Sequence, residues 1–118
     1  MFSERLETLI DSIDGAEVLS LVAKDGIPVE SVSKDPSVDL ELLAAELMSQ
    51  VRAVTQNHQE LAVGRVQHLS IATDNRTLMV SALTEDYYLL LVLANGGNSG
   101  RARFALRRAV LTFEDDLL

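Results

Sequence analysis

Apolar residues recur along the chain with two different spacings, and each spacing predicts a kind of element. Near the N-terminus they fall three or four residues apart, which is typical of one face of a helix over residues 3–13. The segments 16–23 and 27–32 read as strands, and the Asp-Gly pair between them is a strong signal for a hairpin turn. Pro28 has no backbone N–H to donate to a neighbouring strand, so the second strand is expected at a sheet edge.

The longest predicted element is a helix from about residue 37 to residue 61, and it carries two stripes. One broad stripe of leucine and valine is expected to pack on the sheet. On the opposite side lies a stripe of small or apolar residues, Leu42, Ala45, Ser49 and Ala53. Because a helix with two such faces needs two neighbours, we expect the second neighbour to be another copy of the protein.

Three strands and a final helix are predicted in the C-terminal half. Segments 66–72 and 77–83 alternate in polarity, whereas 87–93 is apolar at every position, which is typical of a central strand covered on both faces. A glycine-rich loop then leads into a helix over about 99–114. The order α-β-β-α-β-β-β-α predicts one α/β (α+β) domain over residues 1–118, with a five-stranded antiparallel sheet and helices on both faces.

Charge and composition narrow the class of protein. The 118 residues carry a net charge of −8, which argues against general affinity for nucleic acid or for an anionic membrane. There is no cysteine, and no apolar run is long enough to cross a bilayer, so we expect a cytoplasmic protein without membrane insertion.

The residues offer little catalytic chemistry. The two histidines, His58 and His68, have no partner at metal-ligand spacing, and no phosphate-binding GxxxxGK[ST] loop is present. No nucleophile–base pair is identified, so we expect neither an enzyme nor a cofactor or metal site. Four arginines on the last helix, at 101, 103, 107 and 108, leave two interpretations open. Their stems could cover the helix–sheet seam, or they could form a surface for an acidic partner or a nucleotide phosphate.

The order and spacing of these elements resemble the Roadblock/LC7 domain over nearly the whole chain. The segments that carry the resemblance are the turn 24–26 after the strand 18–22, the long helix starting near Leu40, the strands 69–72 and 78–81 around the turn 74–76, the apolar strand 87–93, and Asn95 and Gly97 before the last helix. Within the family, the chain resembles the prokaryotic, MglB-like members.

The resemblance implies a dimer and a partner. Members of this family pair through the second helix and the third strand of each subunit, which indicates an interface made of Leu42, Ala45, Ser49, Ala53, Gln67, Leu69 and Ile71. MglB-like members act on a Ras-like small GTPase that docks on the paired second helices. On this chain, the corresponding docking residues are Glu46, Arg52, Gln56 and Glu60.

Other hypotheses remain beside a homodimer that docks and regulates such a GTPase, by activating GTP hydrolysis or otherwise. The first is a dimeric scaffold of a signalling or motor complex without a GTPase role. Another is a sensory domain of the profilin-like or PAS-like kind, although few polar groups converge inside an apolar cavity.

Overall fold

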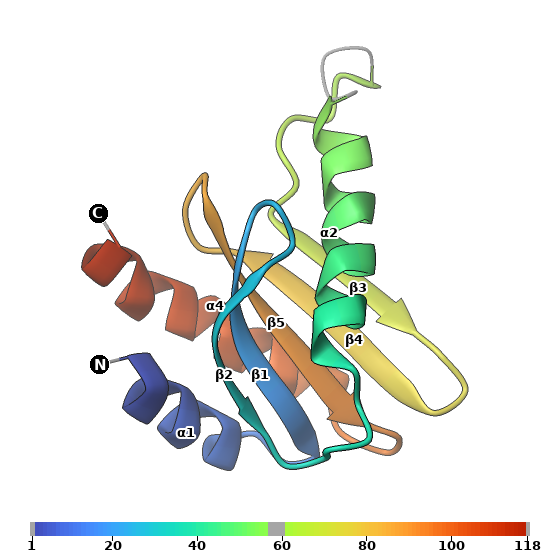
Figure 1. Ribbon diagram of the computed structural model, residues 1–118, viewed down its shortest axis with the longest axis vertical. Coiled ribbons are helices and arrows are strands. Elements are labelled where there is room, and N and C mark those ends of the chain that lie inside the picture. The colour runs from blue at the N-terminus through green and yellow to red at the C-terminus, as the bar shows by residue number, and fades with distance from the viewer. Residues whose placement is uncertain (1, 57–60, 118) are drawn as a thin grey trace.

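The computed structural model describes residues 2–56 and 61–117, and it places helices on both faces of one sheet (Figure 1). The predicted element order and fold class are confirmed. The elements are α1 (Phe2–Ser12), β1 (Ala16–Ala23), β2 (Pro28–Ser33), α2 (Leu40–Gln56), β3 (His68–Ala72), β4 (Arg76–Ala82), β5 (Tyr87–Ala94) and α4 (Ser99–Leu117).

The sheet is antiparallel, and its strands run in the order β2-β1-β5-β4-β3. The apolar strand β5 is therefore central, as its composition predicts. The strand with Pro28 lies at one edge, which confirms that expectation as well. The other edge is β3, so each half of the chain supplies one edge strand.

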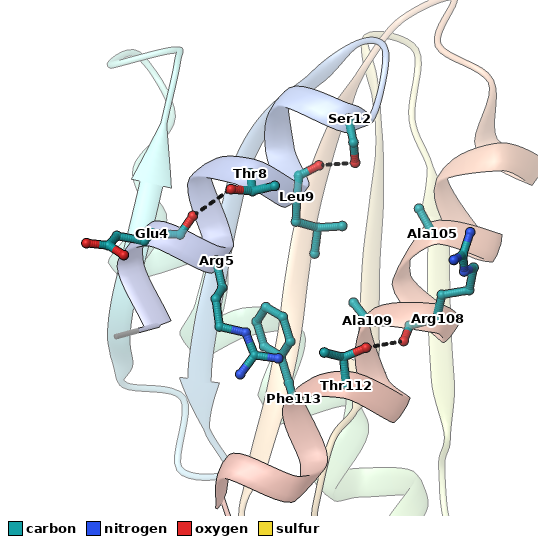
Figure 2. A pocket seen from close by; sticks show the side chains of 10 residues that line it. All are labelled: Glu4, Arg5, Thr8, Leu9, Ser12, Ala105, Arg108, Ala109, Thr112 and Phe113. Carbon is teal, nitrogen blue, oxygen red and sulfur yellow. Dashed lines mark hydrogen bonds between the residues drawn. The ribbon is translucent and has the colours of Figure 1, made fainter.

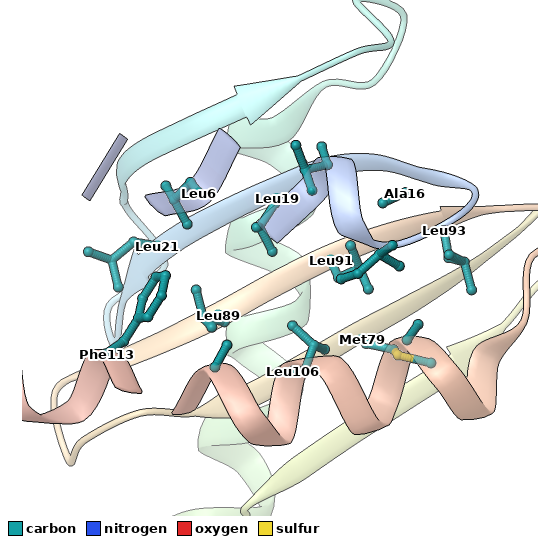
Figure 3. Close-up of a cluster of buried hydrophobic side chains, with 14 of the residues drawn as sticks. Leu6, Ala16, Leu19, Leu21, Met79, Leu89, Leu91, Leu93, Leu106 and Phe113 are labelled. Carbon is teal, nitrogen blue, oxygen red and sulfur yellow. The ribbon is translucent and has the colours of Figure 1, made fainter. Parts of the chain in front are cut away.

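Two hydrophobic cores stabilise the sheet, one on each face. Alternate residues of β5 point to opposite faces, so Leu89 and Leu91 enter one core while Leu90 and Val92 enter the other. The first core lies under α1 and α4 and includes the fully buried Leu106 (Figure 3). The second core lies under α2 alone, so α2 has no helical neighbour on its face among the described residues.

Several element boundaries differ from the sequence prediction, by three residues at the start of α2 and at the end of α4, and β3 begins at His68 rather than at 66. The α2 helix begins at Leu40 rather than near residue 37, because Asp39 supplies the N-cap: its Oδ1 accepts a hydrogen bond from the Leu42 N–H at 3.1 Å. The α4 helix begins after the cap residue Asn98 and continues to Leu117, past the predicted end at 114.

The stripe predicted to pack on the sheet included Val54 and Leu61 but not Met48, and the structure corrects it on these three residues. Met48 is buried on it, whereas Val54 is 38% exposed and Leu61 is 54% exposed. The buried residues of α2 end with Val51, and the C-terminal end of the helix extends beyond the sheet (Figure 1).

Candidate functional site

The outward face of α2 presents the small-residue stripe to solvent. Leu42 on this stripe is 61% exposed. The exposed α2 residues from the two predicted sets are Leu42, Ala45, Glu46, Ser49, Ala53 and Gln56. Small side chains at four-residue spacing allow another backbone to approach closely, so the geometry of this face suits a helix–helix contact.

A guanidinium fixes the start of α2. Arg76, at the beginning of β4, donates from Nε to Glu17 Oε1 and from Nη2 to Asp35 Oδ2, each at 2.8 Å. Asp35 Oδ1 also accepts hydrogen bonds from the Ser37 N–H at 3.0 Å and the Ser37 hydroxyl at 2.6 Å. These Ser37 bonds, and then Arg76, lower the pKa of Asp35. The loop that leads into α2 is therefore tied to the sheet.

The β1–β2 turn holds the middle of α2 from the other side. Gly26 has a φ of +95°, and a Cβ at this position would lie 3.2 Å from the Ala45 Cα. Arg52 is half-buried, and its Nη1 donates to the Lys24 carbonyl at 3.0 Å. Arg52 thus already holds the helix to the turn, which limits its freedom to act as a docking residue.

An open groove of about 410 Å³ separates α2 from β4. Leu42, Leu43 and Leu78 give it an apolar lining, and Glu46 adds a carboxylate to the lining. The groove is open to solvent and shares Leu42 and Glu46 with the exposed face of α2, so a partner bound to that face could also contact the groove.

Hydrogen bonding shows which backbone groups of β3 face the open edge. The Gln67 carbonyl accepts from the Ala82 N–H at 2.9 Å, and the Thr73 N–H donates to the Arg76 carbonyl at 2.7 Å. Because antiparallel pairs alternate, the backbone groups of residues 67, 69, 71 and 73 bond to β4. The N–H and C=O groups of Ser70 therefore point outward, where another strand could bind.

The side chains of Leu69 and Ile71, which the sequence places in the interface, are half-buried against the core under α2. Within one chain they pack on their own helix, and β3 offers a partner mainly its backbone. Gln67 is exposed just before the strand. The predicted docking residue Glu60 lies outside the described residues.

A serine–histidine pair that the sequence reasoning missed lies on the opposite face of β3. His68 Nδ1 and Ser81 Oγ are 2.8 Å apart on directly paired residues. Burial, and then the nearby Arg103, lower the pKa of His68, which favours the neutral ring. Ser81 is buried, so the hydrogen bond between the two side chains joins β3 to β4 at a partly buried position of the sheet.

Residues 2–56 and 61–117 contain neither a metal-binding cluster nor a membrane-spanning helix. No three His, Cys, Asp or Glu side chains lie close enough there to hold a metal ion. No helix in those ranges is sufficiently long and apolar to span a bilayer.

A three-layer domain with an exposed helix beside a free strand edge is the architecture of a protein-binding module. The chain belongs to the Roadblock/LC7 family, because the model of the Roadblock/LC7 domain matches residues 3–94. Domains of this family are generally non-catalytic binding domains. No protein with a curated description matches the sequence.

Solved structures agree with the family assignment. A Roadblock/LC7 domain from Streptomyces avermitilis is similar with a TM-score of 0.85 at 15% identity, covering 98% of this chain and 96% of that one. MglC from Myxococcus xanthus has a TM-score of 0.72 at 28% identity and covers 98% of both chains. The gliding protein MglB from Thermus thermophilus has a TM-score of 0.81 at 21% identity, covering 91% of this chain and 81% of that one.

Proposed function

We propose that this protein is a homodimeric binding module that docks a Ras-like small GTPase on its paired α2 helices. The observation that carries the proposal is the exposed small-residue stripe of α2 beside the open edge of β3. The two features lie next to each other, so one contact with a second copy covers both.

The two sheet edges differ in their protection. Natural edge strands avoid pairing by carrying proline or charged residues. The β2 edge has Pro28 and Glu30, whereas β3, His68–Ala72, contains neither proline nor a carboxylate, lysine or arginine. The β3 edge is thus the one open to strand addition, which would extend the sheet into a second subunit.

The partner proposed for the dimer follows from the family resemblance and from the chemistry of α2. Glu46 and Gln56 are exposed and polar, and they flank the small-residue stripe without taking part in the core. Polar side chains around a stripe of small residues suit a transient interface. The protein would bind the GTPase and regulate it without contributing a catalytic residue.

The experiment is titration calorimetry with the Ras-like small GTPases of the source organism, each loaded with a non-hydrolysable GTP analogue. We expect one of them to bind, and Glu46→Arg to weaken this binding about three- to tenfold by changing a rim charge. The matched control is Glu7→Arg, which makes the same change at an exposed position of α1 on the other face.

Three outcomes would count against the proposal: no GTPase binds, both variants weaken binding equally, or neither changes it. Single-turnover GTP hydrolysis with and without an excess of the protein then separates two roles. Faster hydrolysis indicates an activator, while binding without acceleration indicates a scaffold.

A further inference from the structure

The outward face of α4 carries an unusual set of exposed side chains. Two of them are large and apolar: Phe104 is 62% exposed and Leu111 is 71% exposed. We call the whole set the arginine face, and it consists of Arg101, Arg103, Phe104, Arg107, Arg108 and Leu111. It lies on the side of the sheet opposite α2, so both faces can be occupied at once.

The arginine face concentrates positive charge in an acidic protein. Four of the chain's ten basic residues fall within residues 101–108, and residues 99–113 contain no acidic residue, although the net charge is −8. Among the side chains that the structure describes, none forms an ion pair with these four guanidinium groups. Arg76, by contrast, is bound by two carboxylates.

The four arginines are not part of the core beneath α4. All four are exposed, and the half-buried positions at the border of the α4 core stripe are Ala105 and Val110. The seam between α4 and the sheet is thus closed by small and branched apolar residues rather than by arginine stems. Arg103 and Arg107 are four residues apart, where like charges destabilise a helix.

Helix geometry arranges the face as an apolar ridge between two rows of charge. Phe104 and Leu111 are seven residues apart, so they lie on one line about 10.5 Å long. At roughly 100° per residue, Arg103 and Arg107 flank one side of this line, and the remaining two arginines flank the other. Arg108 stays close to the ridge, with its Cζ 5.9 Å from the Phe104 ring centroid.

A groove of about 570 Å³ between α1 and α4 adjoins the second row (Figure 2). Leu9, Ala105 and Ala109 form part of its apolar lining, and Arg5 and Arg108 stand at opposite sides of it. Phe113 closes one end, with the Arg5 guanidinium 4.3 Å from the centroid of its ring. A segment bound along α4 would therefore find apolar surface beside basic groups.

We propose that the arginine face docks an acidic, amphipathic helical segment of a partner protein. Leucine-like side chains of that segment would pack against Phe104 and Leu111, and its carboxylates would pair with the flanking guanidinium groups, which suit carboxylates well. An anionic membrane fits less well. Two apolar side chains give too narrow a face for insertion, and the net charge repels such a surface.

The test is an NMR titration of the ¹⁵N-labelled protein with a synthetic peptide of about three acidic heptads, with leucine at the a and d positions and glutamate elsewhere. We expect amide shifts in residues 99–113 and binding that weakens as salt is raised. Arg107→Glu should weaken binding about three- to tenfold, since it replaces an attraction by a repulsion. Leu111→Ala should weaken it as well.

The matched control is Arg65→Glu, which changes the net charge equally at another exposed arginine without a described ion pair. Equal effects of Arg65→Glu and Arg107→Glu would overturn the proposal, because they would indicate a general charge effect. Shifts confined to α2 and β3, or no binding of the peptide, would overturn it too. Binding to phosphatidylserine vesicles in place of the peptide would assign the face to a membrane. Arg107→Glu and Leu111→Ala leave α2 untouched, so their effect on peptide binding is independent of the GTPase proposal.

Discussion

Arg76 and Asp35 are 41 residues apart in the chain and form an ion pair, with 2.8 Å between Nη2 and Oδ2. The same guanidinium reaches Glu17 on β1, so it links the two strands that flank β5 to the loop before α2. The exposed face of α2 can serve as a binding surface only if the helix is held in place. This contact supplies that constraint at the N-terminal end.

Replacing Arg76 should therefore loosen α2 as well as destabilise the fold. In Arg76→Ala, two partly buried carboxylates lose their cation, so we expect a lower melting temperature in thermal unfolding. Arg76→Lys should fall between this variant and the native protein, because an ammonium lacks the planar fork that serves two carboxylates at once. Faster amide exchange at residues 40–44 should accompany the loss. Exchange that stays unchanged there in Arg76→Ala would contradict the role given to this contact.

Gly26 is the second constraint on α2, and its effect can be separated from backbone strain. Gly26→Ala should lower the free energy of unfolding by about 1–2 kcal/mol from the positive φ alone, with a further loss from the contact with the Ala45 Cα. The control is Gly96→Ala, because Gly96 has a φ of +90° and a Cβ there would meet nothing within 4 Å.

Urea unfolding of both glycine variants measures the difference. We expect Gly26→Ala to be the less stable of the two. If both lose the same amount, the turn does not press against α2 in solution.

Apolar patterning and turn signals were sufficient to predict every strand and an antiparallel sheet, because burial on a sheet imposes a local pattern. The pairing of β1 with β5, which are far apart in the chain, was not predicted. The start of α2 is different. Asp35, Ser37 and Asp39 are all suitable caps, and Arg76 engages Asp35 from a distant strand, which leaves Asp39 to cap the helix. Which of these residues caps α2 therefore depends on a contact between distant residues, and local sequence patterns do not predict such contacts.

The candidate site could be predicted only in part for the same reason. The stripe from Leu42 to Ala53 follows from helical spacing and is exposed in the single chain, and its role as an interface stays a prediction. The tie between Arg52 and Lys24 does not follow from spacing, since it depends on where the turn meets the helix. The pair His68 and Ser81 could have been found, because pairing outward from the turn at 74–75 places them opposite each other.

The β3 edge gives a direct test of dimerisation. The Ser70 N–H points away from β4, so Ser70→Pro removes an outward donor and leaves the β3–β4 hydrogen bonds in place. We expect this variant to remain folded by circular dichroism but to behave as a monomer in light scattering at micromolar concentration. Ser70→Ala keeps the N–H and should remain a dimer.

A change on α2 tests the same interface from the helix side. Leu42→Arg places a charge on the exposed stripe, and it should weaken the dimer while leaving the monomer folded, since this side chain is already exposed. Leu111→Arg is the matched control, because it makes the same substitution at an exposed leucine of α4. A native protein that is monomeric, or a dimer that both leucine variants weaken equally, would refute the proposed interface.

His68 should make the stability of the fold depend on pH. Because burial and Arg103 lower its pKa in the folded protein, the unfolded chain, with a pKa near the ordinary value of 6.5, binds more protons as the pH falls. The stabilisation is therefore complete above that value, and the free energy of unfolding should decrease as the pH falls through it. Asp35 does not contribute in this range, since its pKa lies below its ordinary value of 3.8.

The measurement is urea unfolding of the native protein and of His68→Gln between about pH 5 and pH 8 at one protein concentration. His58 is present in both proteins, so its titration cancels in the difference between the two curves. We expect the native protein to lose stability more steeply toward acid than the variant. If the two slopes are equal, the imidazole beside Ser81 is not held neutral by its surroundings.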